Sequence, residues 1–171
     1  MIHVYYGDGK GKTSASTGLA VRAAGRGMKV FMVRFMKTDD SGEVLVLKGI
    51  ENIIMYPCLK SFGFTFQMTP EQKEEAKQYY TEVFRKVTSE ENIKEYDMIV
   101  MDEINVVCHY GFVAIEEVVE FLNRSGKEKE IVMTGRYAPE ELRERADYVT
   151  ELRKEKHPFD MGVNARKGIE Y

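Results

Sequence analysis

Short apolar runs alternate along this chain with longer stretches in which apolar residues recur every three or four positions. Apolar runs of about four to eight residues, bounded by Gly, Pro or polar residues, are typical of buried strands. They predict strands over residues 2–6, 29–36, 52–56, 96–101, 130–134 and 147–152. The stretches between them predict helices over residues 12–26, 43–48, 69–92, 113–123 and 139–146.

The helix predicted over 69–92 has the best-marked beginning. Thr69 can cap it, Pro70 suits the first helical position, and Gln72 completes a capping box. Its apolar residues follow the spacing of one buried helical face. They are Ala76, Tyr79, Tyr80, Val83, Phe84 and Val87.

Strands that alternate with helices favour an α/β fold with a mostly parallel sheet covered on both faces. The chain has 171 residues, which suits one domain over residues 1–171. Its composition, 43% hydrophobic and 31% charged, is ordinary for a globular protein and too apolar for a disordered one. We see no internal repeat and no linker.

Charge and cysteine content exclude several classes of function. The 25 Lys and Arg residues and 28 Asp and Glu residues give a net charge of −3, which argues against a nucleic-acid partner. No apolar run approaches the ~18–20 residues that span a bilayer, and no signal peptide is visible. We therefore expect a cytoplasmic protein with no membrane partner. Cys58 and Cys108 alone make neither a disulfide framework nor a zinc site.

A glycine-rich segment follows the first predicted strand and precedes the first predicted helix. It reads Gly7-Asp8-Gly9-Lys10-Gly11-Lys12-Thr13-Ser14. Glycines let backbone N–H groups turn around an anion, and a helix N-terminus adds unpaired donors. Lys12 can reach phosphate oxygens, and the Thr13 hydroxyl can hold Mg²⁺. The spacing is one residue shorter than the common motif, because position 6 is Tyr6. The alternative is a plain glycine-rich turn.

The strand predicted over 96–101 ends in Asp102-Glu103. In an open parallel sheet, ligands bind beyond the carboxyl ends of the strands. A carboxylate there can hold the Mg²⁺ that Thr13 also contacts. The alternative is a polar strand end without a function.

Four basic residues are weaker candidates for a phosphate site. Arg34 and Lys37 lie near the end of the second strand and can add positive charge beside the phosphates, although a solvated strand end explains them equally well. Arg22 lies ten residues after Lys12 and can equally be a surface residue. Arg136 follows Thr134-Gly135 at another strand end, and we expect it to contact ATP or substrate.

Aromatic residues gather in a predicted loop. Phe62, Phe64 and Phe66 lie in an irregular segment, where exposed large apolar groups usually serve a function. Phe64 and Phe66 can line a pocket for a large flat ligand, or the loop can fold into the core. Cys108 and His109 are adjacent, and we interpret both as structural.

Together these motifs resemble those of the CobA/BtuR-type ATP:corrinoid adenosyltransferases. The resemblance extends over nearly the whole chain. It includes the shortened glycine loop, Met101-Asp102-Glu103, Gly63-Phe64-Thr65-Phe66, Thr134-Gly135-Arg136 and the ending His157-Pro158-Phe159-Asp160 … Gly168-Ile169-Glu170-Tyr171. It implies a P-loop NTPase (RecA-like) three-layer fold and a homodimer.

The resemblance also implies a reaction. Co(I) of a reduced corrinoid attacks the 5′ carbon of ATP, and triphosphate leaves. Residues 7–14 would hold ATP, in reversed orientation, with Arg22 and Arg136. Thr13 and Glu103 would bind Mg²⁺ or Mn²⁺. The catalytic residues would be Lys12 with Phe64 and Phe66, the two aromatic rings displacing the lower cobalt ligand. An electron donor such as a flavodoxin-like reductase would be a partner.

Three features depart from the family pattern. Phe66 stands where Trp is frequent, Asp8 stands where Asn is common, and an N-terminal extension that covers the corrinoid in some relatives is not expected here. Two other functions stay open at this point. One is a P-loop kinase of a nucleoside-like substrate, and the other is an ATP-dependent corrinoid carrier without catalytic activity.

Overall fold

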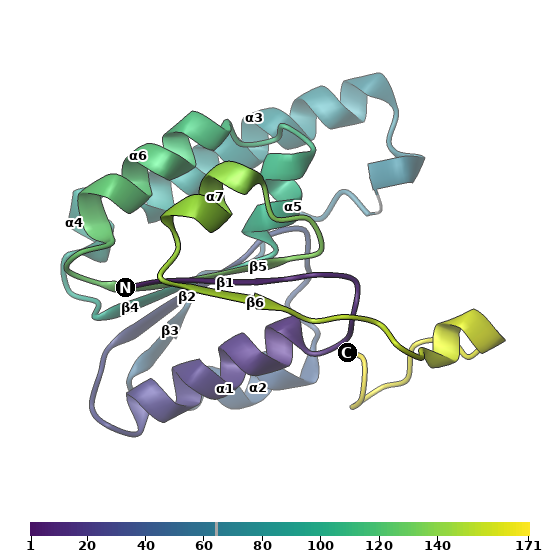
Figure 1. The fold of residues 1–171 in the computed structure, drawn as a ribbon, viewed down its shortest axis with the longest axis horizontal. Helices are drawn as coiled ribbons and strands as arrows, with labels where there is room; N and C mark the ends of the chain where they lie inside the picture. The colour runs from purple at the N-terminus through teal and green to yellow at the C-terminus, as the bar shows by residue number, and fades with distance from the viewer. Residues whose placement is uncertain (64) are drawn as a thin grey trace.

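The computed structural model describes residues 1–63 and 65–171, which form a six-stranded sheet in the order β3-β2-β4-β5-β1-β6 (Figure 1). All neighbouring strands are parallel. The strands are β1 (Ile2–Tyr6), β2 (Val30–Arg34), β3 (Ile53–Met55), β4 (Met98–Asp102), β5 (Glu130–Gly135) and β6 (Tyr148–Glu151). The predicted α/β class with a parallel sheet is confirmed.

Helices cover both faces of the sheet, so the domain has three layers (Figure 1). One face carries α1 (Lys12–Ala24) and α2 (Gly42–Leu47). The other carries α3 (Pro70–Val87), α4 (Glu90–Ile93), α5 (Ile104–His109), α6 (Ile115–Ser125) and α7 (Glu140–Arg145). Two short 3₁₀ helices, η1 (Thr65–Gln67) and η2 (Pro158–Met161), complete the described elements.

The strands divide their side chains between two cores because successive residues of a strand point to opposite faces. In β4, Ile99 and Met101 pack toward α3–α7, whereas Met98 and Val100 pack toward α1 and α2. Both faces are buried, which explains why the strands read as continuous apolar runs.

The structure corrects two expectations about helices. The helix predicted over 69–92 begins as expected, with the capping box between Thr69 and Gln72 in place, but it ends at Val87. Thr88 turns its hydroxyl back onto the carbonyl of Phe84, and a separate helix, α4, begins after Ser89. Helix α5 was not predicted, because three of its six residues, Ile104, Val106 and Val107, are β-branched and have low helix propensity.

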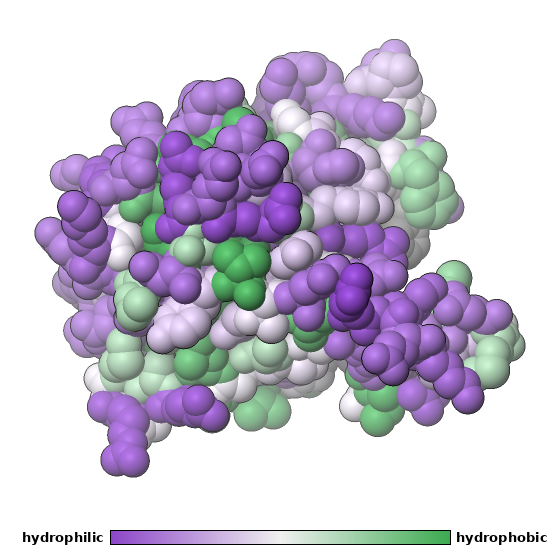
Figure 2. Space-filling view, viewed as in Figure 1, coloured by the Kyte–Doolittle hydropathy of each residue, from purple (hydrophilic) through white to green (hydrophobic). Residues whose placement is uncertain are grey.

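The chain after β6 leaves the sheet and forms a projecting segment (residues 152–171) beside the amino end of α1 (Figure 1). Figure 2 shows mostly hydrophilic side chains over this segment. Among the described residues, no helix is long and apolar enough to cross a membrane.

Candidate functional site

The phosphate loop (residues 7–11) connects the end of β1 to the beginning of α1. Gly7 and Gly11 have φ values of 108° and 116°, in a region that L side chains rarely adopt. A Cβ on Gly7 would also lie 2.4 Å from the carbonyl oxygen of Leu152. Glycine is therefore required at position 7 both by conformation and by the close approach of the chain after β6.

The strands on either side of β1 hold this loop. The Gly7 N–H donates to the carbonyl of Arg136 (3.1 Å), and the Gly9 N–H donates to the carbonyl of Leu152 (2.7 Å). The N–H of Lys154 donates to Asp8 Oδ1 (3.0 Å). Asp8 thus ties the loop to the C-terminal segment.

Lys12 occupies the first position of α1 and folds over the loop. Its Nζ donates to the carbonyls of Gly7 and Gly9, both at 2.7 Å. Burial lowers the pKa of this ammonium below its ordinary value, while the carboxylate of Glu103 acts in the opposite direction. The ammonium therefore lies over the loop, and Ser14 lies in the same helical turn.

A polar cluster lies beside the loop. The Thr13 hydroxyl donates to Asp102 Oδ1 (3.1 Å), and Thr134 Oγ1 donates to the same oxygen (2.6 Å). Lys37 Nζ donates to Asp102 Oδ2 (2.5 Å) and to Thr13 Oγ1 (2.8 Å). Four segments distant in sequence thus meet at one buried carboxylate.

Glu103 adjoins this cluster and is held in an unusual backbone conformation. Its φ is 65°, and its N–H donates to Thr134 Oγ1 (3.0 Å). Burial and, to a lesser degree, the neighbouring Asp102 raise the pKa of its carboxyl group. Its side chain lines both the cavity around the phosphate loop, of about 260 Å³, and a larger cavity beside it.

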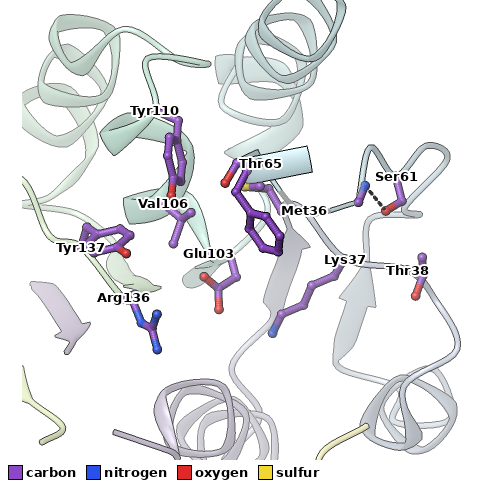
Figure 3. Close-up of a pocket in the computed structure, with 12 residues that line it drawn as sticks. Met36, Lys37, Thr38, Ser61, Thr65, Glu103, Val106, Tyr110, Arg136 and Tyr137 are labelled. Carbon is purple, nitrogen blue, oxygen red and sulfur yellow. Dashed lines mark hydrogen bonds between the residues drawn. The ribbon is translucent and has the colours of Figure 1, made fainter. Parts of the chain in front are cut away.

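The larger cavity, here the aromatic cavity, has a volume of about 500 Å³ (Figure 3). Its lining combines polar and charged side chains with aromatic ones. Tyr110 and Tyr137 project from the segment after α5 and the segment after β5, and Tyr137 stacks on His109 with ring centroids 4.1 Å apart. Its lining is Met36, Lys37, Thr38, Ser61, Gly63, Thr65, Phe66, Glu103, Val106, Tyr110, Arg136 and Tyr137.

A third cavity, here the tail cavity, lies on the other side of Thr13 and has a volume of about 740 Å³. Its walls are the first turns of α1, the segment from Thr38 to Glu43, and the C-terminal residues Gly168 to Tyr171. Lys10 Nζ donates to Glu170 Oε1 (2.9 Å), which connects the phosphate loop to that C-terminal wall. Sequence analysis missed this contact, because no local signal pairs residues 160 positions apart.

The structure brings most of the predicted site residues together. Residues 7–14, Glu103 and Arg136 surround the phosphate loop and the aromatic cavity. Phe66 lines the aromatic cavity with 80% of its surface exposed, and Phe64 lies outside the described residues. Their roles in ATP, metal and corrinoid binding stay predictions.

Two of the predicted basic residues lie elsewhere. Arg22 is in the last turn of α1, about 15 Å along the helix from Lys12. It therefore does not reach the phosphate loop of its own chain. Arg34 is buried and donates to Asp39 and to the carbonyl of Thr38, so its charge serves a loop contact instead of a phosphate. Lys37 does reach the site.

A glycine loop between a strand and a helix, facing an acidic strand end in a parallel sheet, is the arrangement of the P-loop NTPase fold. A solved structure agrees with this fold. The flagellar accessory protein FlaH from Methanocaldococcus jannaschii superposes with a TM-score of 0.55 at 17% identity, covering 88% of this chain and 69% of that chain.

Within that class, the chain belongs to the ATP:corrinoid adenosyltransferase family BtuR/CobO/CobP, whose sequence profile matches residues 1–171. The corrinoid adenosyltransferase of Escherichia coli K12 is 37% identical over 174 residues, covering all of this chain and 85% of that protein. Corrinoid adenosyltransferase CobA of Salmonella typhimurium LT2 is 35% identical with the same coverage. The resemblance found from the motifs is confirmed, and the protein is a transferase of this family.

Proposed function

We propose that this protein transfers the 5′-deoxyadenosyl group of ATP to the Co(I) centre of a corrinoid, in adenosylcobalamin synthesis or salvage. The cobalt supplies the electron pair of the new Co–C bond, the bond between the 5′ carbon and its oxygen breaks, and triphosphate leaves with the electron pair of that broken C–O bond. The observation that supports this proposal is the position of Glu103, which lines both the phosphate-loop cavity and the aromatic cavity. The cavity that we assign to the triphosphate and the cavity that we assign to the corrinoid therefore share a wall.

Residues 7–14 would bind the triphosphate through the Lys12 ammonium and through the loop N–H groups other than those of Gly7 and Gly9, which already donate to protein carbonyls. Arg136 lines the aromatic cavity beside Glu103 and would neutralise further charge (Figure 3). Because the cobalt is itself the nucleophile, the protein need not supply a base. Its contributions are positioning and charge neutralisation.

Thr13 and Glu103 would hold the divalent cation, Mg²⁺ or Mn²⁺. Among the described residues, no three His, Cys, Asp or Glu side chains form a group that could bind a metal alone. A hydroxyl and one carboxylate suit Mg²⁺, which usually keeps several waters and takes its other ligands from substrate phosphates. The bound cation would neutralise charge on the leaving triphosphate.

The aromatic cavity would receive the corrinoid. Phe66, with Phe64, would lie below the corrin ring and displace the lower axial ligand, because an apolar ring cannot replace a lost cobalt ligand. The resulting four-coordinate Co(II) is easier to reduce. We further propose that the protein works as a homodimer in the cytoplasm and receives electrons from a flavodoxin-like reductase.

The test is to mix the protein with Mg-ATP and chemically reduced cobalamin under anaerobic conditions and to identify the phosphorus product. Triphosphate formed only in the presence of the corrinoid would support adenosyl transfer. ADP and a phosphorylated acceptor would instead indicate a kinase. Binding of both ligands without turnover would indicate a carrier.

A further inference from the structure

Lys37 belongs to the polar cluster, and the proposed function assigns it no contact. From the sequence, a contribution of positive charge beside the phosphates and a solvated strand end explain it equally well. It follows β2, whose end lies beside the end of β4, with Arg34 and Asp102 in register. Its Nζ lies 2.5 Å from Asp102 Oδ2 and 2.8 Å from Thr13 Oγ1. Lys37 also lines both the aromatic cavity and the tail cavity, and Thr13, which accepts from its ammonium, lines the tail cavity.

The backbone that presents Lys37 is strained. Among the described residues, only Met36 and Glu103 have positive φ values without being glycine, and Met36 directly precedes Lys37. Such conformations are unfavourable, and they cluster where a side chain must be held in a specific place for function. Figure 3 shows the Lys37 side chain extending into the cavity from this position, facing the same space as Glu103.

The oxygens of Asp102 are already occupied by protein donors. Oδ1 accepts from Thr134 and Thr13, and Oδ2 accepts from Lys37. The Asp102 side chain is fully buried, while that of Lys37 keeps 23% of its surface exposed. A buried ion pair contributes little net stability, because desolvation offsets the attraction. The pair is therefore better explained by what the exposed side of the ammonium can bind.

We infer that Lys37 is a second phosphate-binding lysine, and that Asp102 is its counter-ion and not a ligand of the metal. Lys12 and Lys37 come from different elements, and Thr13 lies between their cavities: it lines the phosphate-loop cavity with Lys12 and the tail cavity with Lys37. Two ammonium groups would thereby share the charge of the leaving triphosphate. This inference rests on the proposed function, because it assigns a ligand to the same nucleotide site.

The first experiment measures binding of inorganic triphosphate and of ATP by calorimetry, without corrinoid. Lys37→Met should weaken both by about 10- to 100-fold, the loss expected for one charge-assisted hydrogen bond. Lys37→Arg should recover part of the affinity. Lys48→Met is the matched control, because Lys48 pairs with Asp39 on the surface at 2.9 Å. Unchanged triphosphate affinity in folded Lys37→Met would overturn the inference.

A second variant covers the case in which Lys37→Met does not fold because Asp102 is left buried without its cation. The double variant Lys37→Met/Asp102→Asn removes both charges and keeps a polar side chain at position 102. It should fold and should show the same loss of triphosphate affinity, and wild-type affinity in this variant would overturn the inference. If the wild-type protein itself binds neither triphosphate nor ATP, it is the proposed function that fails.

The counter-ion role has its own measurement. Mn²⁺ bound to the protein–ATP complex is detected by electron paramagnetic resonance in the Asp102→Asn variant. We expect the Mn²⁺ affinity to stay within about threefold of wild type, a change under 1 kcal/mol. Loss of bound Mn²⁺ in a variant that still binds ATP would contradict this role.

Discussion

Lys10 in the phosphate loop and Glu170 in the C-terminal segment form an ion pair, with Nζ and Oε1 2.9 Å apart. Hydrogen bonds from Arg166 and then from Lys10 lower the pKa of Glu170 to about 2. The contact therefore attaches the segment that forms one wall of the tail cavity to the loop expected to bind phosphate. The segment should hold the nucleotide site closed on that side.

Docking of this segment should depend on pH. The pKa of Glu170 is below the ordinary glutamate value of about 4.3. Ionised Glu170 therefore stabilises the docked segment fully above about pH 4.3, and this stabilisation is lost as the pH falls toward about 2. Hydrogen exchange of residues 157–171 should therefore increase over this acid range. Glu170→Gln should show fast exchange already at neutral pH. Glu155→Gln, in the same segment, is the control, and equal exchange in the two variants would contradict the role of Glu170 in attaching the segment to the loop.

Phe66→Ala should lower the activity that starts from Co(II) more than the activity that starts from Co(I). Activity that starts from Co(II) with a reductant should fall about tenfold or more, because ligand displacement precedes reduction. Activity that starts from pre-reduced Co(I) should fall much less. Phe159→Ala replaces another exposed aromatic residue, on η2, and serves as the control. Equal losses in both assays would rule out a role in displacement.

Gly7→Ala should unfold more easily than the wild-type protein. Its φ of 108° disfavours an L residue, and the new Cβ would lie 2.4 Å from a backbone oxygen of Leu152. We expect a loss of about 2–4 kcal/mol in the free energy of unfolding, measured in urea. Gly18→Ala is the opposite case, because the space around Gly18 is open and α1 is helical there. That variant should gain about 0.5–1 kcal/mol.

As the pH falls, the protein should lose the metal ion at a higher pH than it would if Glu103 had an ordinary carboxylate pKa. The reason is that burial raises the pKa of Glu103, so a proton competes with the cation earlier as the pH falls. Mn²⁺ titration of the protein–ATP complex at several pH values tests this. Glu103→Gln should lower the affinity throughout and remove most of the dependence on pH. A wild-type profile in that variant would mean that Glu103 is not a ligand.

Both thiols should react slowly with iodoacetamide in the folded protein. Burial raises the pKa of Cys58 to about 11 and that of Cys108 to about 12. Because the thiolate is the reactive form, alkylation near neutral pH should be about 100-fold or more slower than for an exposed thiol. Mass spectrometry of native and urea-unfolded protein gives the comparison. Rapid alkylation of native Cys58 would show that its surroundings differ from those described.

Local signals predicted the glycine-rich connection between β1 and α1, and they placed most ends of the five predicted helices within two residues. Thr69 and Gln72 form their capping box within one turn, so the sequence contains all the partners of that structure. The glycines of the loop likewise indicate a backbone conformation that other residues rarely adopt. The prediction that the helix capped by Thr69 continues to residue 92 was wrong. The spacing of apolar residues gives no sign of the hydrogen bond from the Thr88 hydroxyl to the carbonyl of Phe84, which lies at the end of the helix.

The sequence by itself therefore determined the α/β class, the phosphate loop, the acidic strand end and the family. Only the tertiary structure decided which charged groups meet there. The strand order places β2 beside β4 and so brings Lys37 to Asp102, and it places β6 beside β1 and so brings the C-terminal segment to Lys10. Contacts between residues 65 and 160 positions apart depend on how strands pack, which no local pattern contains.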